Sequence, residues 1–217
     1  MFGVWCLAHR SYTAMPWIIV DFKGDELIGQ IPRLREIGMS EKIPRHPGLH
    51  VVRPHPNDID DGGLTAWLFR VWERERVGLF IDEGYMIPQR DKGLRAVLTQ
   101  GRSKRIPVIG LAQRPRDIST FLLSESEVKS VFRLDHPDDT ARMREYIPGQ
   151  DQHGRRIDPL LLPRFSSYWY SSEDWTLHRF GQCPAPAEIL DIYDRRVPVA
   201  RYGIFDLFRP PSGKSGR

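Results

Sequence analysis

The chain has 217 residues, 40% of them hydrophobic, so it is long enough to form one globular domain with a sizeable core. Its formal net charge of +4 allows a polyanionic partner, but 32 basic residues against 28 acidic ones do not by themselves establish nucleic-acid binding. Two cysteines at opposite ends of the chain, without C-x-x-C spacing, indicate neither a disulfide framework nor a zinc knuckle, and no apolar run approaches the roughly 18 residues of a membrane-spanning helix.

The first part of the chain alternates between helical and strand patterns. Apolar side chains recur at helical spacing in three segments and form short continuous runs in two others. Helices are predicted at residues 2–14, 25–37 and 64–72, and strands at 17–24 and 49–53. Pro32 is expected to break or kink the second helix. The first strand carries its polar residues, Asp21 and Lys23, at its carboxyl end.

The stretch from Val77 to Glu83 has the pattern of the central strand of the fold. Its apolar run ends in Asp82 and Glu83, which predicts a central strand, buried on both faces, that delivers two carboxylates. In an open parallel sheet, ligands bind beyond the carboxyl ends of the strands, so we expect both carboxylates to face a ligand. The pattern resembles the Walker B element of P-loop NTPases. A strand that ends in a solvated acidic turn would have the same pattern.

Beyond this strand the alternation continues. Helices are predicted at residues 92–105, 118–127 and 138–146, and strands at 107–113 and 128–134. The strand at 107–113 ends in an amide, Gln113. Alternation at this spacing is typical of an α/β fold, so we predict a mostly parallel sheet with helices on both faces.

The pattern changes after Pro148. Residues 166–170 and 175–180 flank a polar turn and predict a β-hairpin. We therefore expect a core at residues 1–148, a C-terminal extension at 149–208 with a hairpin that packs on the core, and a disordered tail at 209–217.

Two stretches resemble the HerA/FtsK-type ATPases. The run from Thr99 to Pro115, TQGRSKRIPVIGLAQRP, is similar to the family's segment in which an arginine closes a helix and the next strand ends in Gln-Arg-Pro. The run from Trp17 to Gly24 is similar to the family's strand that ends in Asp-x-Lys-Gly. The resemblance covers roughly residues 1–147 and implies a RecA-like P-loop NTPase core with a C-terminal β-hairpin extension.

One departure from this family concerns the phosphate-binding loop. The family's G-x-x-x-x-G-K-[ST] motif precedes the helix that here begins at the first residue, so the first strand and the Walker A loop are expected to be missing from this sequence. A start codon assigned too late, a fragment or a degenerate subunit would each explain this. The tail residues Gly213-Lys214-Ser215 do not replace the loop, because no apolar strand leads into them.

The resemblance implies catalytic roles for three residues. Glu83 would be the catalytic base or the residue that positions the attacking water, and Gln113 would be the amide that senses the γ-phosphate. Arg102 would be an arginine finger that projects into the site of a neighbouring subunit. Arg102 is equally compatible with a solvated basic helix end.

The resemblance also implies a nucleotide and a metal ion. Asp82 would hold Mg²⁺ through water, and Asp21 and Lys23 would join Asp82 in binding the cofactor, ATP with Mg²⁺. An Asp-x-Lys pair also occurs in metal-dependent nucleases, but that chemistry needs another acid upstream, and residues 1–20 contain none.

The resemblance implies an ATP-driven DNA translocase or packaging motor of phage or mobile-element type. Such a motor would hydrolyse ATP with Mg²⁺ in a homo-oligomeric, hexameric ring around double-stranded DNA, in the cytoplasm of a bacterial host or associated with the virion. Two alternatives remain: a filamentous-phage assembly or extrusion ATPase, and a non-catalytic truncated subunit that binds DNA or partner subunits. Enzymatic activity stays open, because the phosphate-binding loop is absent from this sequence.

Overall fold

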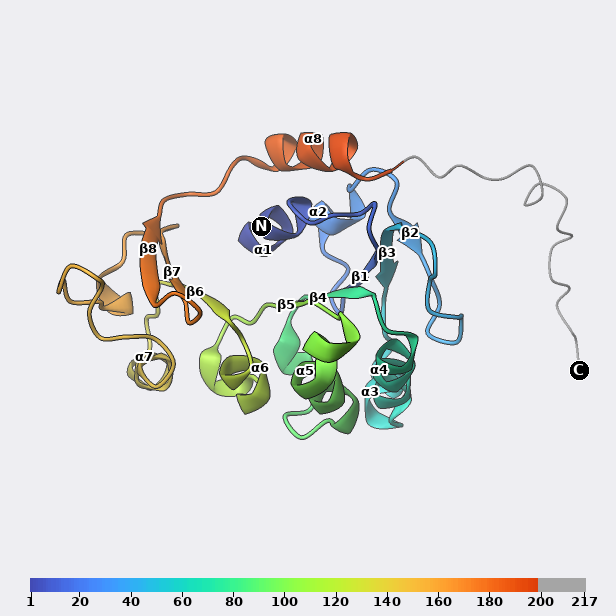
Figure 1. Ribbon diagram of the computed structural model, residues 1–217, viewed down its shortest axis with the longest axis horizontal. Helices are drawn as coiled ribbons and strands as arrows, with labels where there is room; N and C mark the ends of the chain where they lie inside the picture. Colours follow the sequence, from blue (N-terminus) through green and yellow to red (C-terminus); the bar gives the residue numbers. More distant parts are fainter. Residues whose placement is uncertain (199–217) are drawn as a thin grey trace, which may run out of the picture.

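The computed structural model describes residues 1–198 as two β-sheets with helices packed around the larger one (Figure 1). The tail expected at 209–217 and the last part of the extension expected at 149–208 lie outside the described residues. None of the helices in this described part combines the length and the hydropathy that crossing a bilayer requires.

The larger sheet has five parallel strands in the order β2-β3-β1-β4-β5. The strands are β1 (Pro16–Val20), β2 (Arg35–Glu36), β3 (Gly48–Val52), β4 (Gly78–Ile81) and β5 (Val108–Gly110). Every residue of β1 and β4 is buried, as expected of central strands covered on both faces. The sequence therefore predicted the parallel sheet and its central apolar strand correctly.

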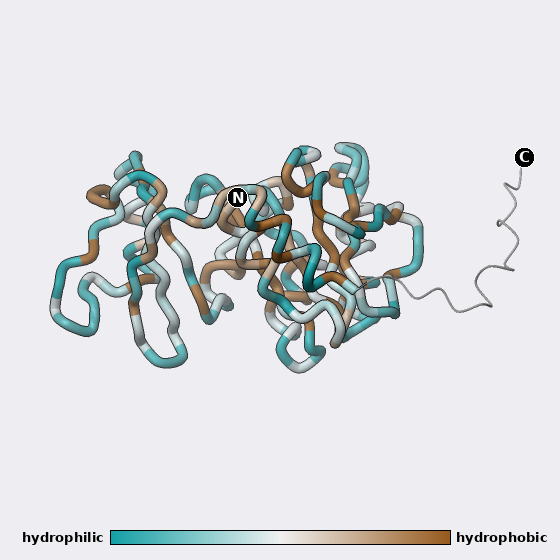
Figure 2. Tube along the Cα trace, turned by 90° about the horizontal axis from the view of Figure 1, so that it is seen from above, coloured by the Kyte–Doolittle hydropathy of each residue, from teal (hydrophilic) through white to brown (hydrophobic). Residues whose placement is uncertain are grey.

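Helices cover both faces of this sheet (Figure 1). One face carries α1 (Phe2–Ala8), α2 (Glu26–Gly29) and α8 (Pro186–Arg196), and the other carries α3 (Pro56–Asp60), α4 (Gly63–Arg74) and α5 (Lys92–Lys104). Each face of the sheet has its own hydrophobic core, and alternate residues of β1 pack into one or the other. Ile18 packs beneath α4 and α5, and Ile19 packs beneath α1 and α8. Figure 2 shows hydrophobic segments gathered inside the molecule and hydrophilic loops outside.

Some predicted helices are shorter than their sequence patterns. The helix expected at 2–14 ends at Ala8, and the helix expected at 118–127 is reduced to α6 (Thr120–Ser124). In the segment expected to be helical at 25–37, helix α2 ends before Pro32, and Arg33 takes a positive φ of 60°. Proline and a left-handed residue cannot continue a right-handed helix, so the chain turns and forms β2 instead.

The predicted hairpin is present, and a third strand pairs with it. The smaller sheet is antiparallel, with the order β6-β7-β8 and the bounds β6 (Val128–Phe132), β7 (Ser167–Ser171) and β8 (Thr176–Phe180). The sequence pattern placed 128–134 in the parallel sheet, but β6 pairs with β7 because Val131 shares a separate core with Tyr170 and Leu177. Helices α6 and α7 (Pro137–Arg144) contribute to this core. The described part of the chain also contains three short 3₁₀ helices: η1 (Gly84–Met86), η2 (Pro115–Asp117) and η3 (Pro159–Leu161).

The last described helix returns to the first one. The Tyr193 hydroxyl of α8 donates a hydrogen bond to the Val4 carbonyl oxygen of α1 at 2.7 Å. Arg33 donates to the carbonyl oxygens of Asp194 and Val197 at 2.6 and 3.2 Å. These contacts fix α8 on the face of the parallel sheet that α1 and α2 cover.

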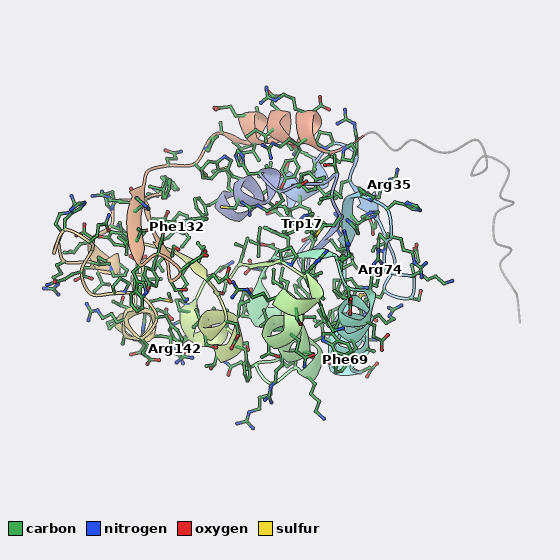
Figure 3. The ribbon with its side chains drawn as sticks, viewed as in Figure 1. Trp17, Arg35, Phe69, Arg74, Phe132 and Arg142 are labelled. Carbon is green, nitrogen blue, oxygen red and sulfur yellow. The ribbon has the colours of Figure 1, made fainter. Side chains whose placement is uncertain are left out.

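The contact between Gly78 and Trp17 gives a test of the packing between β1 and β4. A Cβ added at Gly78 would overlap the indole ring of Trp17, which is buried and labelled in Figure 3. Gly78→Ala is therefore expected to lower the free energy of unfolding by about 1–3 kcal/mol through overpacking. Urea denaturation followed by circular dichroism measures this change.

Gly29→Ala is the matched control. Gly29 ends α2, has no positive φ and has open space where its Cβ would lie. Alanine there should leave the stability unchanged or raise it slightly, because glycine is the poorer helix former. Equal effects of the two substitutions would contradict the packing between β1 and β4 described above.

Candidate functional site

Polar side chains follow three neighbouring strands at one edge of the parallel sheet. Asp21 follows β1, Asp82 and Glu83 follow β4, and Gln113 lies just beyond β5. Backbone hydrogen bonds extend the pairing past the strands, since the Asp82 N–H donates to the Val20 carbonyl oxygen at 3.0 Å. The structure thus brings these four sequence-predicted residues to one edge, as parallel pairing requires.

Glu83 lies at the centre of this group. Its Oε1 atom accepts hydrogen bonds from Lys23 Nζ at 2.6 Å and from Gln113 Nε2 at 2.7 Å. The Glu83 side chain is 11% exposed, whereas that of Lys23 is 47% exposed. The hydrogen bond to Glu83, followed by the one to Tyr85, raises the pKa of Lys23 above its ordinary value, so Lys23 is an ammonium group.

The backbone at Glu83 is strained. Its φ of 56° and ψ of 54° lie in the left-handed region, which a residue with a side chain adopts only at a cost of about 1–2 kcal/mol. The following N–H, that of Gly84, donates to the Leu111 carbonyl oxygen beyond β5. This tight turn aims the Glu83 carboxylate across the strand ends toward Lys23 and Gln113.

Asp82 lies in a different electrostatic environment. Burial is the largest cause that raises its pKa from 3.8 to about 6. Three neighbouring carboxylates, those of Glu83, Asp25 and Asp21, add to this rise, and the amino group of Met1 opposes it. A partly buried carboxylate among other carboxylates is stabilised by any cation that binds beside it.

The donor set at this edge fits Mg²⁺ only in part. Magnesium takes oxygen ligands and usually keeps several waters, with one or two carboxylates and substrate phosphates completing the shell. Asp82 can supply one such carboxylate, and waters and phosphates would have to supply the other ligands. Within residues 1–198 no group of three or more His, Cys, Asp or Glu side chains is arranged to hold a metal ion by itself.

Asp21 stabilises the turn next to the site through hydrogen bonds. Its Oδ1 atom accepts from the N–H groups of Gly24 and Asp25, at 2.8 and 3.1 Å, and its Oδ2 atom accepts from Arg53 Nε at 3.1 Å. These bonds hold the turn that carries Lys23. Sequence reasoning missed Arg53, although the residue directly follows β3 and therefore reaches the same sheet edge.

Arg102 does not join this group. Helix α5 runs back to the amino end of β5, so Arg102 lies at the edge opposite Glu83. Its side chain is 88% exposed and contacts Glu127 Oε1 at 3.3 Å. An exposed pair of this kind contributes less than about 1 kcal/mol, so it does not hold the guanidinium firmly.

Sequence comparison connects the chain to a phage protein. No protein-family model matches the chain. Over 146 residues the chain is 38% identical to DNA packaging ATPase P9 of Enterobacteria phage PRD1, and this alignment spans 67% of the chain and 63% of P9. The chain is homologous to P9.

The chain also resembles solved structures. It superposes on the genome packaging NTPase B204 of Sulfolobus turreted icosahedral virus 2 in complex with AMPPCP with a TM-score of 0.62 and 16% identity, covering 85% of this chain and 89% of B204. The ATP-γS complex of B204 gives 0.61 and 17%, covering 84% and 88%. The α/β fold with a mostly parallel sheet, expected from the sequence, is thereby confirmed and is shared with B204, while the assignment to the HerA/FtsK branch stays a prediction.

The raised pKa of Asp82 makes Asp82→Asn a stabilising substitution in the metal-free protein. Ionised Asp82 costs the folded state free energy, because its folded pKa of about 6 exceeds the ordinary value of 3.8. The cost is complete above about pH 6 and absent below about pH 4. Asparagine removes it, so urea unfolding in EDTA at about pH 8 should show a gain of about 1–2 kcal/mol, allowing for solvent screening.

This gain should disappear as the pH approaches 4. Asp191→Asn, at an exposed position in the middle of α8, is the control and should change the stability little at either pH. A gain at Asp82 that persists unchanged at about pH 4 would contradict the electrostatic explanation.

Proposed function

We propose that this chain forms the ATPase core of a DNA packaging motor of phage type. The observation that carries the proposal is the meeting of Asp82, Glu83 and Gln113 at the carboxyl edge of the sheet, in a chain 38% identical to a packaging ATPase. Because the alignment spans 63% of P9, the activity, the substrate and the partners of the whole protein are part of the proposal.

In this proposal Glu83 acts on the attacking water. A carboxylate that faces the strand ends can accept a proton from water as the water oxygen attacks the γ-phosphate of ATP, which yields ADP and phosphate. The amide of Gln113 contacts the same carboxylate oxygen, so a change at the γ-phosphate that moves Gln113 would also move Glu83. Lys23 neutralises Glu83, and its release would leave the carboxylate free to act as a base.

Asp82 is the residue that would hold Mg²⁺, through water. When bound, the ion would neutralise charge on the phosphate oxygens. A phosphate-binding loop would have to enter α1, because backbone N–H groups at such a helix start cradle phosphates in P-loop NTPases. The close approach of Gly3 in α1 to the Leu111 side chain supports this placement, since it puts the start of α1 beside the carboxyl end of β5.

The proposed partners are double-stranded DNA and further copies of the chain, which would assemble into a hexameric ring. The basic residues nearest the proposed subunit interface are Lys104, Arg105, Arg114 and Arg116. Three of them have carboxylate partners: Lys104 contacts Glu75, Arg114 contacts Asp139, and Arg116 contacts Asp117 and Asp138. Since these carboxylates compete with phosphates, we expect those three residues to bind DNA less tightly than freely solvated arginines would.

ATP hydrolysis tests the proposal directly. The 217-residue chain and a version extended upstream to carry a phosphate-binding loop are compared for ATP binding and for DNA-stimulated phosphate release. In the active form, Glu83→Gln should lower turnover at least about a hundredfold and spare ATP binding, because the amide cannot accept the proton.

Glu73→Gln, at an exposed position on α4, should leave turnover unchanged. If Glu83→Gln hydrolyses ATP at the normal rate, Glu83 is not the base. If neither version binds nucleotide, the proposal of an ATPase core fails, and a non-catalytic subunit that binds DNA or partners becomes the better description.

Mixed oligomers test Arg102. Arg102→Ala should abolish DNA-stimulated hydrolysis without loss of stability, because its exposed pair with Glu127 contributes little to folding. Mixing Arg102→Ala subunits with Glu83→Gln subunits should restore part of the activity, since an intact arginine then serves a neighbour's intact Glu83. Arg195→Ala, at another exposed arginine, is the control. Full activity of Arg102→Ala alone, or no recovery in the mixture, would show that Arg102 is a solvated residue at the end of α5 and not an arginine finger.

A further inference from the structure

An aromatic pocket lies between α1 and the antiparallel sheet. It has a volume of about 270 Å³, and aromatic rings line it from both sides: Phe2 and Trp5 of α1, and Trp169 and Phe180 of the sheet. The ring centroid of Phe2 lies 5.6 Å from that of Trp5 and 6.2 Å from that of Trp169, which lies 6.0 Å from that of Phe180. Since a cavity of roughly 150 Å³ suffices for benzene, the pocket can accept a phenylalanine side chain.

One arginine provides a positive charge at the rim of the aromatic pocket. Arg10 comes two residues after α1, is exposed and lines the pocket. Its Nε atom donates to the Cys6 carbonyl oxygen at 3.2 Å, and within residues 1–198 no carboxylate forms an ion pair with it. A guanidinium without a carboxylate partner can bind one that approaches from outside. The aromatic pocket therefore fits a ligand that carries an aromatic group close to a carboxylate.

The chain contains a segment of this chemistry beyond the described residues. Residues 202–208 have the sequence Tyr-Gly-Ile-Phe-Asp-Leu-Phe, and Asp206 is the single acidic residue of 199–217. A segment so rich in apolar and aromatic side chains gains free energy when it packs against an apolar surface. In an extended backbone, side chains two residues apart point to the same side. The Phe208 ring could thus enter a pocket while the Asp206 carboxylate meets a cation at its rim.

The end of α8 lies within reach of the aromatic pocket. The Tyr193 hydroxyl donates to the Val4 carbonyl oxygen at 2.7 Å, and Val4 directly precedes Trp5 of the pocket wall. Val197, which is buried, caps α8 one turn beyond Tyr193. A helical turn rises only about 5.4 Å, whereas the eleven residues 198–208 span up to about 36 Å when extended. The segment therefore needs no second copy of the chain to reach the pocket.

We propose that the aromatic pocket binds residues 202–208 of the same chain, with the Phe208 ring among the aromatic side chains and the Asp206 carboxylate paired with the Arg10 guanidinium. The bound segment would cover Phe180, which is 39% exposed. It would also add a tie between α1 and the antiparallel sheet. The proposal concerns an interaction within the chain and holds whether or not the chain hydrolyses ATP.

Alkylation of Cys6 tests the proposal in the full 217-residue chain. Cys6 lines the pocket and is half-buried, so a bound segment would shield its thiol from N-ethylmaleimide. Phe208→Ala should raise the alkylation rate of Cys6 at least about fivefold, because the segment then loses its aromatic anchor. Mass spectrometry of the peptide that contains Cys6 gives the rate. Phe165→Ala, at an exposed phenylalanine outside the pocket, is the matched control and should leave the rate unchanged.

Charge reversal tests the ion pair between Asp206 and Arg10. Burial raises the pKa of the Cys6 thiol to about 11 and Arg10 lowers it, so rates are compared only between chains with the same residue at position 10. Asp206→Lys should raise the alkylation rate about twofold or more where Arg10 is kept, since like charges then meet at the rim. In chains that carry Arg10→Glu, the same substitution should lower the rate, because it restores opposite charges.

Three results would overturn the proposal. The first is an alkylation rate of Cys6 that Phe208→Ala does not change. The second is an effect of Asp206→Lys that has the same sign with Arg10 and with Arg10→Glu. The third is shielding of Cys6 that is lost on dilution, because docking within one chain does not depend on concentration. This last result would assign residues 202–208 to the pocket of a second copy.

Discussion

The parallel pairing of β1 with both β3 and β4 is the constraint on which the candidate site depends. Its register places Val20 opposite Val52 and Ile81, and the backbone hydrogen bonds continue one residue further. The first polar residue after each strand therefore stands at the same level of the sheet. A slip of one residue would exchange the two faces of β1 and would also move Asp21 and Asp82 out of line. The buried apolar strands thus fix the position of the charged groups.

The candidate site lowers the stability of the fold, whereas the buried cores raise it. Glu83 occupies a left-handed backbone conformation, and the pKa of Asp82 is raised because its carboxylate is partly buried near others of like charge. Both features destabilise the fold locally, and the two buried cores on either side of the sheet offset them. Such an arrangement is typical of sites in which a cation and a polyphosphate are bound, since a bound cation relieves the repulsion between the carboxylates.

The sequence predicted the parts of the fold that depend on local pattern. The apolar run before Asp82, the strand before Gln113 and the hairpin are present, because burial and alternation along a short segment suffice to specify them. The extended helix at 25–37 was wrong, since Pro32 and the positive φ of Arg33 outweigh the helical spacing. The partner of β6, the role of Arg53 and the contact between Lys23 and Glu83 join distant segments, and no local pattern encodes such contacts.

Helix α1 is held from two directions. Tyr193 of α8 binds its backbone, and the ring of Phe2 packs edge-on against Phe132 and Trp169 of the antiparallel sheet. The helix therefore acts as a mechanical link between segments that are far apart in the sequence. Any displacement of its first turn, which lies next to Leu111 at the carboxyl edge, must either break these contacts or drag α8 and the antiparallel sheet along with it. A small movement at the strand ends would then be transmitted to α8 and to the antiparallel sheet.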